Sequence, residues 1–230
     1  MKLLAFETAT EACSVALWID GQVRERFEIA PRRHAELALP WADALLAEAG
    51  IAKSHLDAVA VGRGPGAFTG VRLAIAIAQG IALALDRPVV PVSTLQALAM
   101  QASGQRILAA VDARMGEVYL GAFIRDRDGL PQAAGDETVA RPDGVAIPEG
   151  DWSGVGSGFA AVDKALEKRL QGRLSSIDSS ALPHAGDVAR LAALAFARGE
   201  AVAPERAEPA YLRNDVALTL QQQQALRASR

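Results

Sequence analysis

Residues 62–72 read GRGPGAFTGVR and lie between a short apolar run, Ala58–Val61, and a long one, Val71–Leu85. A buried strand, a glycine-rich turn and a helix in this order predict an α/β protein. Many nucleotide sites begin in this way. The loop therefore either holds a phosphate or only directs the helix that follows it.

The residues around this loop fit neither common phosphate-binding loop. A Walker P-loop needs a lysine for the phosphates, and no lysine occurs between Lys53 and Lys164. A dinucleotide-binding loop needs an acidic residue at the end of the next strand, whereas the strand Val89–Val92 ends at Ser93. We therefore interpret the glycines as a tight strand-to-helix turn.

In this interpretation Pro65 is rigid, Phe68 fills the core and Thr69 caps the helix. The residues of this structural loop are Gly64, Pro65, Gly66, Phe68, Thr69 and Gly70.

The helix predicted at 71–85 has almost no polar face, since its polar residues are Arg72, Gln79 and the following Asp86. A helix on a sheet at a protein surface normally has one polar side. We expect this helix to be covered on both sides, by its own sheet and by either the second lobe of this chain or a partner protein, of which we favour the partner. Small residues recur along it at Ala74, Ala78 and Ala82 and at Ala76, Gly80 and Ala84.

Composition predicts a globular protein of one large domain or two small lobes, because the chain has 230 residues, of which 50% are hydrophobic. The net charge of -3, without a long basic cluster, argues against a nucleic-acid site on this chain alone. The single cysteine, Cys13, excludes an internal disulfide. The longest charge-free stretch spans roughly 20 Å as a helix, short of a bilayer core of roughly 30 Å. We expect a soluble, cytoplasmic protein with no membrane contact.

The order of predicted elements repeats about halfway along the chain. Strands at 3–6, 13–19 and 23–29 come first, with Glu7 after the first strand and a hairpin signal at Asp20-Gly21. Strands at 107–111 and 118–123 follow in the second half, with Asp112 and a second signal at Asp128-Gly129. Chance is one explanation, but an internal duplication leaves this order. We therefore predict two related α/β lobes that face each other.

Further helices are predicted at 33–49, 159–170 and 187–198, the last with Asp187 as its N-cap and Gly199 as its stop. Ser93 and Gln96 form a capping-box pattern. The predicted boundaries are 1–105 for the N-terminal lobe with the partner-binding helices, 106–205 for the C-terminal lobe, and 206–230 for a segment that returns toward the N-terminal lobe and ends in a polar tail.

Glu7 and Asp112 each follow a strand in matching places of the repeat. A carboxylate can hold a magnesium ion with nucleotide phosphates, but acidic residues are also ordinary in turns. We interpret Glu7, Thr8, Thr10 and Asp112 as a possible vestigial nucleotide or phosphate site.

No catalytic constellation stands out. The histidines, His34, His55 and His184, lack metal-site spacing, and Cys13 lies in an apolar strand. The sequence predicts no metal and no cofactor, and a protein that works by binding.

Several segments together resemble the TsaB family: LLAFETAT at 3–10, RRHAE at 32–36, GPGAFTGVR at 64–72, VDARMGEVY at 111–119 and PAYLR at 209–213. They cover nearly the whole chain in the family's order. The resemblance implies the actin-like, Hsp70-like and sugar-kinase-like fold of two duplicated lobes with a cleft. Glu7 and Ala67 depart from the common Asp and Ser, which weakens any nucleotide binding.

The resemblance further implies a role in making threonylcarbamoyladenosine in tRNAs that read codons beginning with A. TsaB proteins are not the transferase; they pair with the subunit TsaD, are joined by the ATPase TsaE, and form homodimers when alone. TsaD uses a His-x-x-x-His metal motif, and here the second histidine is replaced by Ala38. We expect tRNA to be reached only through the complex.

The interface with TsaD is expected on the helices at 33–49 and 71–85, so that Ile77→Glu or Ala78→Arg breaks the pair and leaves the fold intact. A small-molecule kinase using ATP is the alternative function, and a peptidase is a weaker one. The expected interface residues are Leu37, Trp41, Leu45, Val71, Leu73, Ala74, Ile77, Ala78 and Ile81.

Overall fold

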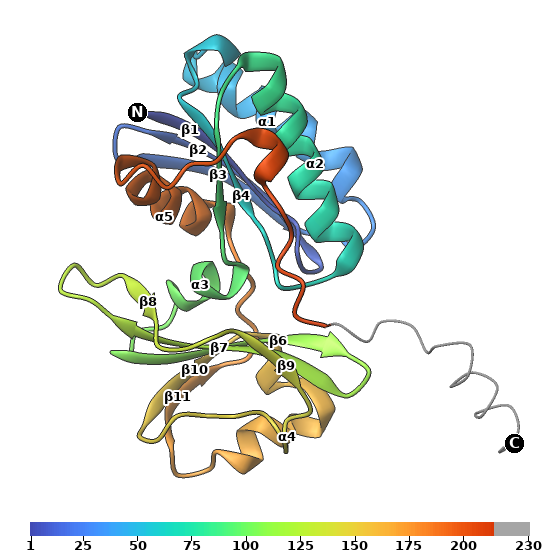
Figure 1. The fold of residues 1–230 in the computed structure, drawn as a ribbon. Helices are drawn as coiled ribbons and strands as arrows, with labels where there is room; N and C mark the ends of the chain where they lie inside the picture. The colour runs from blue at the N-terminus through green and yellow to red at the C-terminus, as the bar shows by residue number, and fades with distance from the viewer. Residues whose placement is uncertain (214–230) are drawn as a thin grey trace, which may run out of the picture.

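The computed structural model describes residues 1–213, which form two lobes, each built on one sheet (Figure 1). The first sheet has the strand order β3-β2-β1-β4-β5. Its antiparallel half is β3-β2-β1, and its parallel half is β1-β4-β5. The strands are β1 Lys2–Glu7, β2 Ala12–Ile19, β3 Gln22–Ile29, β4 Ala58–Gly62 and β5 Val89–Val92.

The second sheet has the order β11-β10-β6-β7-β8, with β9 also paired to β7. Its pairs β6-β7 and β7-β8 are antiparallel, and β6-β10 and β10-β11 are parallel. The strands are β6 Arg106–Arg114, β7 Glu117–Arg125, β8 Pro131–Ala133, β9 Thr138–Ala140, β10 Trp152–Val155 and β11 Leu174–Asp178.

The two sheets share one topology. In each, three consecutive strands form an antiparallel meander, and two parallel strands extend the sheet on the free edge of the first strand. β1, β2 and β3 correspond to β6, β7 and β8, and β4 and β5 correspond to β10 and β11. This correspondence confirms the predicted duplication and the two-lobed α/β fold.

Helices cover both faces of the first sheet. The α-helices of the described chain are α1 His34–Ala49, α2 Phe68–Leu85, α3 Thr94–Ala99, α4 Ala161–Arg169 and α5 Ala185–Ala197. Alternate residues of β1 point to opposite faces. Leu4 and Phe6 pack under α1 and α2, whereas Leu3 and Ala5 pack under α5.

The second sheet is covered by α4 on one face and by α3 on the other. Leu108 and Ala110 of β6 pack with Leu166 of α4, and their neighbours Ile107 and Ala109 pack with α3. Since α3 also contacts α5, it lies between the lobes (Figure 1). Short 3-10 turns occur at Lys53–His55, Ser157–Phe159 and Pro204–Arg206.

The return of α5 to the first lobe departs from the expected division at residue 205. α5 contacts the first sheet along β1, β2 and β4, so the N-terminal lobe takes in residues from both ends of the chain. Asp187 is not its N-cap: the N-cap position is His184, and Asp187 pairs with Arg190 in the first turn. The α5 amides at Ala185 and Gly186 instead donate to Ser14 and Glu25 of the sheet.

By length and composition alone, α2 is the one helix in the described part of the chain that could cross a membrane. Its stripe of Ala74, Ala78 and Ala82 is fully buried against the sheet. We therefore interpret α2 as a core helix of a globular lobe.

The glycine loop brings the start of α2 against the turn between β1 and β2. A Cβ on Gly70 would lie 1.9 Å from the carbonyl oxygen of Thr8, and one on Gly66 would lie 2.4 Å from that of Ala9. Gly64 has φ +89°, a conformation that favours glycine. The loop therefore directs the helix, as expected, because its glycines leave room for backbone rather than for a phosphate.

Gly70→Ala should destabilise the protein by about 3 kcal/mol or more, because the new methyl group overlaps a carbonyl oxygen that belongs to a buried strand turn. Gly80→Ala in the same helix is the matched control: nothing lies within 4 Å of its Cβ. The control should gain about 0.5–1 kcal/mol of stability. Urea denaturation measures both, and equal stabilities would contradict this role of Gly70.

Candidate functional site

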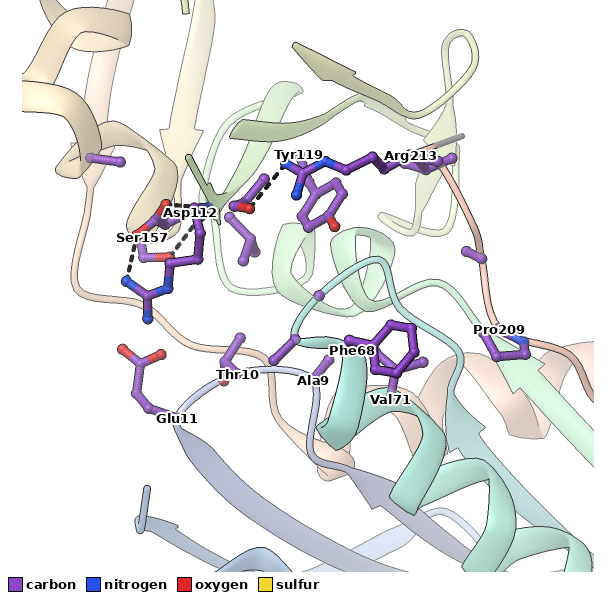
Figure 2. Close-up of a pocket in the computed structure, with 18 of the residues that line it drawn as sticks. Ala9, Thr10, Glu11, Phe68, Val71, Asp112, Tyr119, Ser157, Pro209 and Arg213 are labelled. Carbon is purple, nitrogen blue, oxygen red and sulfur yellow. Dashed lines mark hydrogen bonds and ion pairs between the residues drawn. The ribbon is translucent and has the colours of Figure 1, made fainter. Parts of the chain in front are cut away.

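A cavity of about 800 Å³ opens between the lobes, and we call it the interlobe cavity. Figure 2 shows its walls: the β1–β2 turn at Ala9 to Glu11, the start of α2 at Phe68, the β6–β7 hairpin after Asp112, and Arg213 near the end of the described chain. This volume is in the range of small-molecule sites.

Asp112 lines the cavity, as expected for a cleft residue, but its carboxylate is already engaged. It accepts hydrogen bonds from the backbone N–H and the guanidinium of Arg114, both at 2.8 Å. Its own N–H donates to the Ser157 hydroxyl at 3.2 Å (Figure 2). A carboxylate held by a guanidinium is a poor general base.

Thr10 also lines the cavity, whereas Glu7 and Thr8 lie buried behind it. The Thr8 hydroxyl donates to the carbonyl of Gly70 at 2.7 Å. The Glu7 carboxyl accepts from the N–H of Ala9 at 2.7 Å and from the Thr94 hydroxyl at 2.8 Å. These two residues of the predicted phosphate site therefore tie β1 to α2 and α3.

Burial raises the pKa of Glu7 from 4.5 to about 7, against the hydrogen bonds from Ala9, Thr94 and Thr8, which lower it. Gly62 gives the carboxyl its space, because a Cβ there would lie 1.9 Å from Oε2. Glu7 is thus a structural carboxyl whose pKa lies near neutral pH, and it does not face the cavity.

Two predictions about the glycine loop were wrong. Phe68 does not fill the core, because its side chain is 63% exposed and its ring lies 3.2 Å beneath the guanidinium of Arg72. Thr69 does not cap the helix, because α2 begins one residue earlier with Ala67 at the N-cap position and no side-chain cap. Arg72 also donates to the hydroxyl of Tyr211.

The outward side of α1 and α2 is the second candidate site, and we call it the outer face. It is apolar along α2, whereas on α1 its apolar residues are interspersed with the exposed Glu36, Asp43 and Glu48. Its most exposed large apolar residues are Leu39, at 47%, and Leu83, at 62%. Between them lie residues that are half-buried or exposed. The outer face comprises Leu37, Leu39, Trp41, Leu73, Ala76, Ile77, Gly80, Ile81, Leu83 and Ala84.

The expected interface residues divide into two groups. Leu37, Trp41, Leu73, Ile77 and Ile81 belong to the outer face. Leu45, Val71, Ala74 and Ala78 are buried against the sheet, at no more than 5% exposure. The buried four cannot meet a partner while the lobe is folded. Ala78→Arg is therefore a test of folding and not of binding.

Ser14, Glu25 and His184 form a polar cluster where the chain returns to the first lobe. The Ser14 hydroxyl donates to Glu25 at 2.6 Å, and His184 Nδ1 lies 3.2 Å from the other oxygen of Glu25. Burial would raise the pKa of Glu25, but hydrogen bonds from His184, Ser14 and Gly186 outweigh it and hold that pKa below its usual value. The same carboxylate raises the pKa of His184. The cluster anchors α5, since Ser14 and Glu25 accept hydrogen bonds from the first two amides of that helix.

Sequence reasoning missed Arg72, Tyr211 and Arg213 as cavity residues, and Leu39 and Leu83 as the most exposed part of the outer face. Helical periodicity could have found Leu83, which follows Ala76 and Gly80 on one stripe. No local pattern announces Tyr211 or Arg213, because they meet α2 and the β6–β7 hairpin across about a hundred residues of sequence or more. Within residues 1–213, no group of three or more His, Cys, Asp or Glu side chains is placed to hold a metal ion.

The chain matches the family model of TsaD, tRNA N6-adenosine threonylcarbamoyltransferase, over residues 27–221. Over 226 residues it is 45% identical to the tRNA threonylcarbamoyladenosine biosynthesis protein TsaB of Escherichia coli, covering 94% of this chain and 96% of that protein. The Haemophilus influenzae protein of the same name is 37% identical over 231 residues, covering 94% and 95%.

Among solved structures, the chain resembles that of an uncharacterized protein with similarity to peptidase YEAZ from Pseudomonas aeruginosa. The TM-score is 0.85 and the identity 48%, over 92% of this chain and 99% of that one. With the duplicated sheets, this likeness confirms the expected actin-like, two-lobed architecture.

The buried Glu7 carboxyl predicts how stability depends on pH. Between pH 4.5 and about 7 the unfolded chain loses this proton and the folded chain keeps it. The free energy of unfolding therefore falls as the pH rises through this window, by about 2–3 kcal/mol, and the loss is complete above it.

Glu7→Gln cannot ionise, so its unfolding free energy should rise relative to the wild type by about 2–3 kcal/mol between about pH 4.5 and pH 8. Urea denaturation at several pH values measures this difference. Glu11→Gln, at an exposed carboxyl of the same turn, is the control and should run parallel to the wild type. If the unfolding free energy of Glu7→Gln depends on pH in the same way as that of the wild type, the burial argument is contradicted.

Proposed function

Because the chain belongs to the TsaB family, we propose that it is a non-catalytic scaffold subunit in the synthesis of threonylcarbamoyladenosine in tRNA. It acts by pairing with a TsaD-like transferase subunit through its outer face. The relatives named above carry the name of this biosynthetic pathway, which supports the role. The proposed place of action is the cytoplasm.

The outer face is the observation that supports this proposal most strongly. On two neighbouring helices it leaves many apolar side chains half-buried or exposed, and large exposed apolar patches mark binding surfaces. A specific interface buries about 800 Å² on each partner, which two helices can supply. Ala76, Gly80 and Ala84 are small and exposed, so a helix of the partner can approach α2 closely.

The same surface accounts for the other proposed contacts. A TsaD-like subunit presents the equivalent helices of the shared fold, and a second copy of this chain presents identical ones, so heterodimer and homodimer compete for one face. A TsaE-like ATPase joins the heterodimer, and tRNA is reached through the complex, in keeping with a net charge of -3.

A peptidase function has little support in the geometry, although the similar Pseudomonas structure is described with that word. Burial raises the pKa of the Cys13 thiol to about 11, so this side chain is a poor nucleophile. Ser14 is fully buried, so a peptide substrate cannot reach its hydroxyl, which donates to Glu25 and not to a histidine. The ring of His34 is paired with the backbone and not with a nucleophile, because its Nε2 lies 3.0 Å from the carbonyl oxygen of Thr10.

A small-molecule kinase is the alternative function, and the interlobe cavity is the observation that favours it. A kinase needs a free base near the substrate hydroxyl, and Asp112 is paired with Arg114. Titration calorimetry with magnesium-ATP separates the two functions, because a kinase of this fold binds the nucleotide alone. Binding by the purified chain would favour the kinase.

Leu83→Glu should weaken binding to the purified TsaD-like subunit from the same organism by about 30-fold or more, because a charge placed within an apolar interface is left desolvated. The melting temperature should stay close to that of the wild type, since Leu83 is 62% exposed. Titration calorimetry or sedimentation measures the affinity.

Leu194→Glu on α5 is the matched control, because this leucine is also exposed, at 39%, but lies on the opposite face of the first sheet. It should leave the affinity unchanged. Ile77→Glu should act like Leu83→Glu, and equal binding by all three variants and the wild type would overturn the assignment of the outer face.

A further inference from the structure

Residues 207–213, which we call the strap, run from α2 to the β6–β7 hairpin and so join the two lobes (Figure 1). At the first lobe, the N–H of Ala210 donates to the carbonyl of Arg63 at 2.8 Å. Gln79 of α2 donates to the carbonyls of Pro204 and Ala207 at 3.0 and 3.2 Å. The start of the strap is therefore fixed to the helix that carries the outer face.

Among residues 1–213, one side chain holds the other end of the strap. Arg213 donates to the carbonyl of Ala113 at 3.2 Å and to the carboxylate of Glu117. The two charged side chains are partly buried, at 21% and 31% exposure. A second nitrogen of Arg213 lies 3.6 Å from the sulfur of Met115 at the hairpin tip. Charge-assisted hydrogen bonds of this kind are the stronger ones in proteins.

The strap is the third connection between the lobes. The chain first crosses through α3 and returns through residues 179–184, where Gln101 donates to the carbonyl of Leu182 at 2.7 Å. The strap crosses on the α2 side of the interlobe cavity, where Pro209 and Arg213 line the cavity (Figure 2). Tyr211 lines it as well. Because the lobes are connected both at α3 with residues 179–184 and at the strap, the hinge motion that two-lobed enzymes use is restricted.

Few groups in the described part of the chain hold the strap closed. Tyr211 is 57% exposed, so little apolar surface is buried there. Nη1 of Arg72, stacked between Phe68 and Tyr211, is buried without a hydrogen-bond partner among the described residues. An unsatisfied buried donor costs free energy. This cost offsets part of what the hydrogen bond and the stacking of Arg72 with Tyr211 contribute to the closed state, so the contacts of Arg213 carry much of what holds it.

We propose that the strap is a latch that keeps the two lobes at one angle, and that it opens by release of Arg213 from the β6–β7 hairpin. The cavity fits this reading, because two of the charged side chains that line it are already paired at the β6–β7 hairpin: Asp112 with Arg114 of the same hairpin, and Arg213 of the strap with Glu117. The proposed latch does not depend on whether the outer face binds a TsaD-like subunit.

Hydrogen exchange on the full chain tests the latch. In Arg213→Ala, the amide of Ala210 and the amides of the 112–118 hairpin should exchange about tenfold faster than in the wild type, because loss of the charged hydrogen bonds raises the population of the open strap. Added salt should speed exchange of Ala210 in the wild type and not in the variant, since it screens the ion pair.

Arg206→Ala is the matched control, because Arg206 is exposed and makes no side-chain bond within the described residues. It should behave as the wild type. A nitroxide pair on Ser54→Cys and Gln171→Cys, exposed positions in opposite lobes, reports the lobe angle. Its distance distribution should broaden about twofold in Arg213→Ala.

Two results overturn the latch. One is exchange and distance distributions that are the same for Arg213→Ala and Arg206→Ala. The other is faster exchange throughout both lobes in Arg213→Ala, which means global destabilisation. Glu117→Gln is the second variant, which should reproduce the effect of Arg213→Ala, and the charge swap of Glu117→Arg with Arg213→Glu should restore slow exchange.

Discussion

The contact between the β1–β2 turn and the first turn of α2 sets the geometry of both candidate sites. The backbone of Thr8 and Ala9 lies directly against Gly66 and Gly70, closer than any side chain allows. This contact fixes the rotation of α2 on the sheet, so that Ala74, Ala78 and Ala82 face inward. The opposite stripe, with Leu83, then faces outward and forms the outer face. The same contact places Phe68 at the mouth of the interlobe cavity.

One helix thereby connects three features of the molecule. The outer face runs along α2, the interlobe cavity opens at its N-terminal end, and Gln79 and Arg72 tie it to the strap. The polar groups near the cavity mostly hold the structure together: Glu7 joins β1 to α3, and Asp112 is paired with Arg114. This distribution, with an open apolar face and an internally bonded cleft, supports a protein that works by binding.

The duplication and nearly all of the long elements could be predicted, because strands alternate with period two and the turn signals recur in order. The rotation of α2 could not. Periodicity finds stripes of small and large residues, but both stripes are apolar, and only the contact at Gly70 decides which one meets the sheet. The contacts of Glu7 and the capping of α5 could not be predicted for a related reason. Glu7 accepts from Thr94, and the first amides of α5 donate to Ser14 and Glu25, all of which are far away in the sequence. Local rules for turns and caps contain no information about such partners.

The most direct test of the scaffold role is to deplete this protein in its source organism and quantify threonylcarbamoyladenosine in bulk tRNA by mass spectrometry of digested nucleosides. The account predicts that the modified nucleoside is lost, that the wild-type chain restores it, and that a chain with a charge in the outer face does not, although it folds. Unchanged nucleoside levels in cells with no second copy of the gene would contradict the scaffold role and direct attention to the interlobe cavity.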